Sequence, residues 1–202
     1  MSQASVAAHG KLPFPVNLHT WIERNRTRLR PPVGNVVLAD DGFLVMLVGG
    51  PNTRTDYHIE NYEEIFFQIE GDITLKVVDE HSNPPEFRDI CIKQGELFVL
   101  PAGVPHSPQR PAHSVGLVIE RKRSSEDVDI LRWYCQSCFS VLHEGKFHCE
   151  DIGKDLVPVI RAYFADLSLR TCRRCGWTEP EPAESSCVSP RGVEDESAVG
   201  AR

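Results

Sequence analysis

Short apolar runs separated by turn-forming residues dominate the middle of the chain, between Asn35 and Glu120. The runs read VVL, FLVMLVGG, EIFFQIEG, ITLKVV, ICI, LFVL and VGLVIE. Between them lie sequences such as DDG, EGD, NPP and QG, which favour tight turns. Strands of this length at this spacing predict an antiparallel all-β sandwich or barrel.

Two other segments show helical periodicity. The first covers residues 17–29, where apolar residues recur at helical spacing before Pro31 and Pro32 would end a helix. The second covers residues 151–167 and repeats that spacing. From Glu179 onward the chain is rich in Pro, Glu, Ser and Gly, so a disordered tail is predicted there.

Composition and charge limit the classes of partner. Hydrophobic residues make up 41% of the 202 residues, enough for one well-buried domain. The net charge of -7 argues against a nucleic-acid surface, and we interpret the alternate arginines from Arg24 to Arg30 as a solvated helix face. No apolar stretch approaches the roughly 18 residues of a membrane span, and the first residues lack a signal pattern. We therefore expect a cytoplasmic protein with neither nucleic-acid nor membrane partners.

One histidine stands where a predicted strand runs into a tight turn. The stretch GELFVLPAGVPHSPQR covers residues 95–110, and its strand LFVL is followed directly by Pro101. Pro101 and Gly103 set a turn that would hold His106 near a strand end, facing the interior of a barrel. A single histidine in such a place is more often a packed core residue than a ligand, so its role depends on what lies nearby.

A second segment supplies candidate partners for that histidine. The stretch RTDYHIENYEEIFFQIEG, residues 54–71, places His58 and Glu64 six residues apart. Because side chains alternate along a strand, an even separation can put both groups on one face. Two imidazoles and one carboxylate on the inner wall of a barrel would leave open coordination positions, an arrangement suited to non-haem Fe(II) and O2. Glu60 and Glu63 are competing carboxylates, and spacing alone does not decide between Glu63 and Glu64.

Both segments resemble the two sequence motifs of the cupins. This resemblance implies a double-stranded β-helix, a jelly-roll barrel with flanking helices, and a metal held by the two histidines and Glu64. A typical cupin has a further histidine two positions after the first, where this chain has Glu60. The pattern H-x5-E-x6-G matches at His58, Glu64 and Gly71, and the pattern G-x5-P-x-G-x2-H matches at Gly95, Pro101, Gly103 and His106.

Longer stretches narrow the resemblance, and they read PPVGN, GGPNTRTDYHIE, EEIFFQIEGD, LPAGVPHSPQRP and GLVIERKR. Over roughly residues 14–178 they resemble the 3-hydroxyanthranilate 3,4-dioxygenase family. The resemblance implies an Fe(II) enzyme that opens the ring of 3-hydroxyanthranilate with O2. Its product would be 2-amino-3-carboxymuconate 6-semialdehyde, the precursor of quinolinate in NAD synthesis from tryptophan through the kynurenine pathway. Homodimers are also implied by the resemblance.

The family resemblance assigns roles to individual residues. It implies that Arg110 binds the substrate carboxylate, that Glu120 accepts from the substrate amine and orients Arg110, and that Arg54 stands beside the oxygen site. Glu64 would serve both metal and substrate. An arginine offers a planar fork to a carboxylate, and a cation near oxygen would stabilise developing negative charge. Two rivals remain: a dioxygenase for another aminophenol or catechol, and a non-enzymatic cupin that binds a metal or small anion.

Four cysteines form two CxxC pairs that predict a second metal site. Cys135 and Cys138 lie in CQSC, and Cys172 and Cys175 lie in CRRC. Four thiolates suit tetrahedral zinc or iron, and a redox dithiol is the alternative. Some microbial members of the resembled family carry a rubredoxin-like iron here, which implies a structural role. Cys91 alternates within a predicted strand and is expected in the core.

These features suggest three parts along the chain. We expect an N-terminal helix and cupin barrel over residues 1–130. A C-terminal rubredoxin-like metal segment with a helix would follow over residues 131–180, and a disordered tail over residues 181–202.

Overall fold

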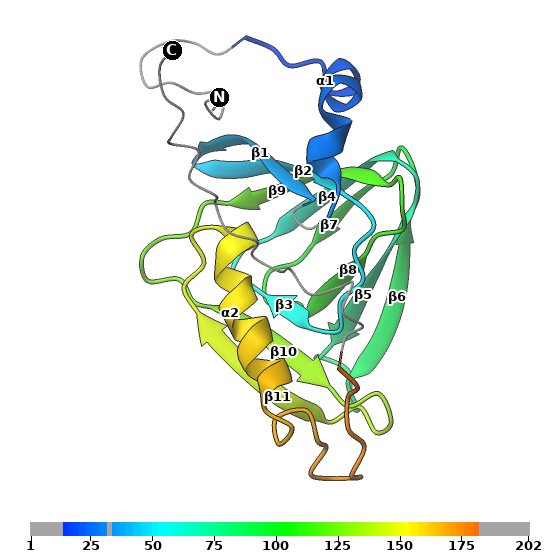
Figure 1. Cartoon of the computed structure of the whole chain (residues 1–202), viewed down its shortest axis with the longest axis vertical. Coiled ribbons are helices and arrows are strands. Elements are labelled where there is room, and N and C mark those ends of the chain that lie inside the picture. The colour runs from blue at the N-terminus through cyan, green and yellow to red at the C-terminus, as the bar shows by residue number, and fades with distance from the viewer. Residues whose placement is uncertain (1–13, 32–33, 182–202) are drawn as a thin grey trace, which may run out of the picture.

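Two antiparallel sheets form the body of the protein (Figure 1). The computed structural model describes residues 14–31 and 34–181. The five-stranded sheet has the order β1 (Asn35–Asp41), β2 (Phe43–Gly49), β9 (Val115–Arg121), β4 (Glu64–Glu70) and β7 (Leu97–Leu100). The six-stranded sheet has the order β11 (Val141–Phe147), β10 (Asp129–Tyr134), β3 (Tyr57–Ile59), β8 (His106–Gln109), β5 (Ile73–Asp79) and β6 (Glu86–Ile92). Strands far apart in sequence pair in both sheets, as in a jelly roll.

The apolar core lies between the two sheets. Met46, Phe66 and Val118 of the five-stranded sheet pack in one cluster with Leu75 and Ile92 of the six-stranded sheet, and all are at most 3% exposed. Full burial of a side chain of this size contributes about 1.5–3 kcal/mol. Each apolar run that predicted a strand lies in one, so the all-β cupin fold is confirmed.

A short N-terminal helix covers part of the outer face of the five-stranded sheet. Helix α1 (Leu18–Asn25) begins after Asn17, whose side chain accepts a hydrogen bond from the backbone N–H of Thr20 (3.0 Å). The chain then tightens into a 3-10 turn, η1 (Arg26–Leu29). Fully buried Ile22 anchors this segment to the sheet. The predicted helix over residues 17–29 is therefore α-helical for its first two turns and 3-10 at its end.

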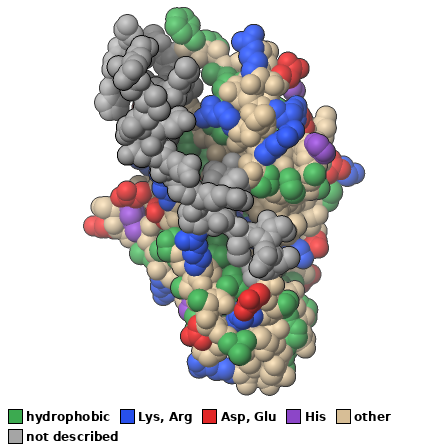
Figure 2. Space-filling model, in the orientation of Figure 1, with side chains coloured by type: hydrophobic (Ala, Val, Ile, Leu, Met, Phe, Trp, Pro, Cys, Tyr) green, Lys and Arg blue, Asp and Glu red, His purple; other side chains and the backbone are tan. Residues whose placement is uncertain are grey.

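Arginines of this segment make contacts within the chain. Arg26 forms a bidentate ion pair with Glu70 (2.7 and 2.9 Å), and Arg28 lies over the ring of Trp21, 5.6 Å from its centroid. Lys and Arg side chains are visible at the end of the molecule where α1 lies (Figure 2). These contacts fit the interpretation of the arginine run as a solvated face.

The second helix packs on strands β10 and β11 (Figure 1). Helix α2 (Ile152–Ala165) is capped by Asp151, whose side chain accepts from the backbone N–H of Gly153 (2.9 Å). Its Tyr163 stacks on Trp133 of β10, with ring centroids 4.1 Å apart. The helix ends two residues before the predicted limit because the backbone turns extended at Asp166.

The predicted C-terminal segment continues the six-stranded sheet. Strand β10 pairs with β3 on one side and with β11 on the other, and it spans the boundary expected at residue 130. The division into three parts stays a prediction, and residues 182–202 of the expected tail lie outside the described residues. The expectation for Cys91 was wrong: it is exposed, because β6 is the edge strand and this residue points away from the core. Among the described helices, none has the length and apolar character of a membrane span.

Candidate metal and substrate site

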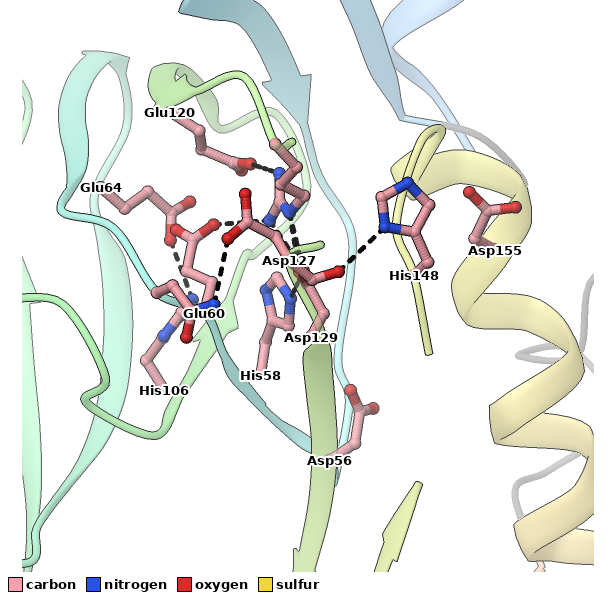
Figure 3. Close-up of polar contacts among 12 residues, drawn as sticks. Asp56, His58, Glu60, Glu64, His106, Glu120, Asp127, Asp129, His148 and Asp155 are labelled. Carbon is pink, nitrogen blue, oxygen red and sulfur yellow. Dashed lines mark hydrogen bonds and ion pairs between the residues drawn. The ribbon is translucent and has the colours of Figure 1, made fainter. Parts of the chain in front are cut away.

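Strands from both sheets bring the candidate residues together inside the barrel (Figure 3). His58 of β3 pairs directly with His106 of β8, and Glu64 of β4 pairs directly with Glu120 of β9. All four residues are at most 5% exposed. The cross-strand register thus collects two imidazoles and two carboxylates that are far apart in the sequence.

Glu64 and His106 present two donor atoms to one point. Glu64 Oε2 lies 2.9 Å from His106 Nε2, yet this buried oxygen makes no hydrogen bond with any described residue. His106 Nδ1 lies 3.0 Å from the carbonyl oxygen of Val104, which only accepts, so Nδ1 carries a proton and Nε2 is the ring atom that faces Glu64. When Nε2 is unprotonated, these two atoms can take neighbouring positions on one metal ion. Glu63 is exposed, so burial favours Glu64 over Glu63.

His58 lies beside this pair and is held by a carboxylate that the sequence did not single out. The ring centroids of His58 and His106 are 5.4 Å apart. His58 Nε2 lies 2.6 Å from Asp129 Oδ2. Burial, the largest effect, lowers the pKa of His58 below its usual value. A neutral imidazole that donates one N–H to a carboxylate keeps a lone pair on its other nitrogen, an arrangement common around bound metals. Among the described residues, however, this nitrogen does not form a group within 4.8 Å with the ligand atoms of Glu64 and His106.

Three buried carboxylates crowd one side of the site. Ligand oxygens of Glu60, Glu64 and Glu120 all lie within 4.8 Å of one another. Burial first, and then the charges of Glu64 and Glu120, raise the pKa of Glu60 to about 10. Burial and the charge of Glu64 likewise raise the pKa of Glu120 to about 7. Glu60 Oε1 and Glu64 Oε2 have no hydrogen-bond partner in the described part of the chain, so this set of oxygens fits a divalent cation.

The two candidate substrate residues have different partners from those expected. Glu120 was expected to orient Arg110, but its Oε2 accepts from Arg123 Nη1 (2.7 Å). Arg110 is 2% exposed and donates through Nη1 to Gln68 Oε1 (3.2 Å). Among the described residues it makes no ion pair, and burial lowers its pKa to about 10. A buried guanidinium without a carboxylate partner is suited to an anionic ligand.

Gly116 leaves the space that Arg110 and Gln68 occupy. A Cβ at this position would lie 2.3 Å from Gln68 Oε1 and 2.9 Å from Arg110 Nη1. We expect Gly116→Ala to displace both groups, cost about 1–3 kcal/mol of unfolding free energy, and raise the KM for a carboxylate substrate. Denaturant unfolding and steady-state kinetics measure the two effects. In the control Gly145→Ala, where the new Cβ meets Val159 Cγ1 instead, stability should fall without a change in KM. An unchanged KM in Gly116→Ala would contradict this role.

Arg54 lies in the connection before β3 and is tied to its own neighbourhood. Its Nε donates to Asp56 Oδ2 (2.9 Å), and its Nη2 makes a second, shorter contact with the same oxygen. Its backbone oxygen accepts from Gln109 Nε2 (3.0 Å), which links it to β8. After larger effects of burial and neighbouring groups, the charge of Arg54 acts to lower the pKa of both site histidines. Asp56 therefore holds this cation in the connection that leads into β3.

The four cysteines of the two CxxC pairs lie close together, two of them just after β10 and two after α2. Their sulfur atoms lie within 4.8 Å of one another, with Cys135 and Cys175 Sγ 3.5 Å apart and Cys138 and Cys172 Sγ 3.6 Å apart. Ser140 Oγ lies 3.3 Å from Cys172 Sγ. Its hydrogen bond, followed by one from the backbone of Cys175, lowers the pKa of Cys172 to about 6. A thiolate is the form that binds metal, so this cluster has the chemistry of a tetrahedral site.

The fold and the two clusters define a cupin with groups suited to metal binding. Residues 12–164 match the family described as 3-hydroxyanthranilic acid dioxygenase. The chain belongs to this family.

Named relatives cover most of the chain. It is 49% identical over 174 residues to a protein of Xanthomonas campestris pv. campestris (strain 8004) named 3-hydroxyanthranilate 3,4-dioxygenase, covering 86% of this chain and 97% of that protein. A protein of the same name from Neurospora crassa is 47% identical over 165 residues, covering 82% and 89%. A solved cupin-2 domain protein from Shewanella frigidimarina aligns at 20% identity with a TM-score of 0.39, covering 52% of this chain and 99% of that one.

Proposed function

We propose that this chain is an Fe(II)-dependent dioxygenase that opens the ring of 3-hydroxyanthranilate. His58, Glu64 and His106 would hold the iron. The observation that carries the proposal is the pair of adjacent ligand atoms on Glu64 and His106 inside the same barrel as Arg110, a buried cation that makes no ion pair within residues 14–31 and 34–181. A site that binds a metal and an anion together suits an aromatic substrate with chelating groups next to a carboxylate.

The chain's residues would orient this substrate at two points. The substrate carboxylate would accept two hydrogen bonds from the guanidinium of Arg110, whose burial makes this pairing stronger than on a surface. The amine beside that carboxylate would donate to Glu120, which Arg123 holds in place from the other side. Fixing the carboxylate and the amine of the substrate limits its ring to one orientation, with the hydroxyl and the amine on the same side of the site.

Fe(II), if held by His58, Glu64 and His106, would supply the redox chemistry for the reaction of the ring with O2. Arg54, fixed near the histidines, would stabilise negative charge that develops on oxygen. Both oxygen atoms would enter the product as the bond between the hydroxyl-bearing carbon and its neighbour away from the amine breaks. The product would be 2-amino-3-carboxymuconate 6-semialdehyde. Its closure to quinolinate would place the enzyme in NAD synthesis, and the free cysteines fit a cytoplasmic location.

Ring opening by reconstituted protein tests this proposal. Metal-free protein would be loaded anaerobically with Fe(II), Mn(II) or Zn(II), mixed with 3-hydroxyanthranilate and air, and followed by the absorbance of the semialdehyde. Turnover is expected with Fe(II) alone. Turnover of 2-aminophenol at the same kcat/KM would favour the aminophenol rival, and tight metal and ligand binding without turnover would favour the non-enzymatic cupin.

We infer that the four cysteines hold a second, structural iron or zinc. Cys172→Ser should lose one metal equivalent per chain and lower the unfolding temperature, because the metal links the segment after β10 to the segment after α2. Elemental analysis and thermal unfolding measure both. The exposed Cys91→Ser is the matched control and should change neither. Full metal content in Cys172→Ser would contradict the site, and loss of ring opening per folded molecule would contradict its purely structural role.

We also propose that the protein is a homodimer. The outer face of the five-stranded sheet offers apolar side chains for such contact: Phe43, Leu97 and Val99 are 56%, 61% and 50% exposed. Leu97 and Val99 lie directly beside Phe67 and Ile65 in the register, which makes the apolar surface continuous. Sedimentation equilibrium should give twice the 22.7 kDa of one chain. A single-chain mass at micromolar concentration would contradict the proposal.

A further inference from the structure

One buried arginine connects groups that the proposed function assigns to the substrate and to the metal. The side chain of Arg123 is 5% exposed. Its Nη1 donates to Glu120 Oε2 (2.7 Å), its Nη2 to Glu60 Oε2 (2.5 Å) and its Nε to Asp129 Oδ1 (2.8 Å). Asp129 in turn contacts His58 Nε2 (2.6 Å). A single guanidinium therefore links Glu120 to His58 through Asp129. Figure 3 shows Glu120, Asp129 and His58 around the site.

We propose that Arg123 is a positioning residue for ring opening. It holds the carboxylate of Glu120 toward the substrate amine and, through Asp129, fixes the ring of His58 for the metal. This inference rests on the proposed function for the roles of Glu120 and His58. The planar fork of an arginine suits this task, because its donors point in fixed and different directions and can reach three carboxylates from one side chain.

The same contacts leave Arg110 free for the substrate. The site holds three carboxylates within 4.8 Å of one another, and two of them, Glu60 and Glu120, are paired with Arg123. Arg110 instead donates to the neutral amide of Gln68 (3.2 Å). Arg123 thus pairs with the fixed carboxylates of the site, and Arg110 is left to bind the carboxylate of the substrate.

The loops around Arg123 hold it in place. Arg123 follows β9 directly, and Asp127 in the same connection accepts from Tyr62 Oη (3.0 Å) and Asn61 Nδ2 (3.2 Å). Those two residues lie in the loop between β3 and β4, next to Glu60. Gly103 in turn donates its backbone N–H to the carbonyl of Glu60 (2.8 Å). Three connections are therefore joined around the guanidinium, so the positions of the carboxylates are set together.

Substitution of Arg123 tests the inference with separate readouts for chemistry and binding. In Arg123→Gln, loaded with Fe(II), kcat per bound iron should fall about 10- to 100-fold. The Kd for 3-hydroxyanthranilate, titrated anaerobically, should rise less than about threefold because Arg110 remains. Arg123→Lys should recover only part of kcat, since an ammonium cannot replace all three contacts. The control Lys122→Gln removes an exposed neighbouring charge and should match the unchanged protein in each measurement.

A third variant separates the link to the metal from the link to the substrate. Asp129→Asn keeps the contact of Arg123 with Glu120 but weakens the hold on His58. We expect a chelator to remove iron about tenfold faster from Asp129→Asn and from Arg123→Gln than from the control, with the faster phase confined to one iron per chain. If Arg123→Gln does not fold, kcat per iron and the rate of iron removal are measured in Arg123→Lys and Asp129→Asn instead.

The outcomes distinguish this inference from the proposed function. One outcome would overturn the positioning role alone. The unchanged protein would open the ring, and kcat per iron in Arg123→Gln and Arg123→Lys would stay within about twofold of the control. A fall in thermal stability with unchanged kcat per folded, iron-loaded molecule would do the same. If the unchanged protein does not open the ring, the proposed function fails, and equal chelator rates in all variants would then overturn the link from Arg123 to the metal site as well.

Discussion

His106→Ala is expected to abolish iron retention in the barrel and to lower kcat/KM by more than about 1000-fold. His106 Nε2 is aimed at the same point as Glu64 Oε2, and its protonated Nδ1 is held by the carbonyl of Val104. Alanine offers no nitrogen that could bind the iron. Without the iron, the neighbouring carboxylates would repel one another. Iron per chain, measured by elemental analysis after dialysis, should fall by one equivalent, while the equivalent at the four cysteines stays.

Controls for this result come from matched residues in the same chain. His81 is exposed in the turn between β5 and β6, so His81→Ala should keep both metal equivalents and full activity. Glu64→Gln and Glu63→Gln form a second matched pair, one buried and one exposed. We expect the first to lose iron and the second to keep it. Iron retained at full stoichiometry in His106→Ala, with activity, would contradict the ligand assignment.

Arg110→Gln is expected to lower kcat/KM for 3-hydroxyanthranilate about 100- to 1000-fold, because a buried charge pair with the substrate carboxylate is lost. Turnover of 2-aminophenol, which lacks the carboxylate, should change less than about threefold. Arg110→Lys should restore little, since a single ammonium does not reproduce the bidentate fork. The exposed Arg121→Gln is the control and should discriminate between the substrates as well as the unchanged protein does.

The same substitution should make the substrate-free protein more stable. Arg110 is buried, and among the described residues it makes no ion pair, so its charge is held in place at a cost to folding. Glutamine removes that charge and can still bond to Gln68. We therefore expect Arg110→Gln to unfold at higher denaturant concentration in the absence of substrate. Equal losses of turnover for both substrates, or a large loss of stability, would show that Arg110 has a structural role instead.

The core strands could be predicted from the sequence because they carry the apolar alternation. Strands β4 and β5, for example, bury alternate residues along most of their length. Strands β3 and β8 were not predicted, although they carry the two site histidines. β3 is only three residues long and β8 reads HSPQ, so neither has an apolar pattern to detect. The motif spacing nevertheless singled out His58 and His106, which the pairing of β3 and β8 places directly opposite each other; their role as ligands stays a prediction.

The contacts around the site could not be predicted, because they depend on pairing between distant strands. Glu64 meets Glu120 only through the register of β4 and β9. The partners Gln68, Arg123 and Asp129 carry ordinary polar side chains, and nothing in the sequence indicates which ion or amide each would meet. The stretch GLVIERKR contains both Glu120 and Arg123, and its two charges three residues apart were the one local signal of their pairing.

The most direct test of the central claim is oxygen incorporation by the Fe(II)-loaded protein under ¹⁸O2. We expect one O2 consumed for each ring-opened semialdehyde formed from 3-hydroxyanthranilate, with both labelled atoms in the product. Incorporation of a single labelled atom, or oxygen uptake without ring-opened product, would contradict the dioxygenase assignment.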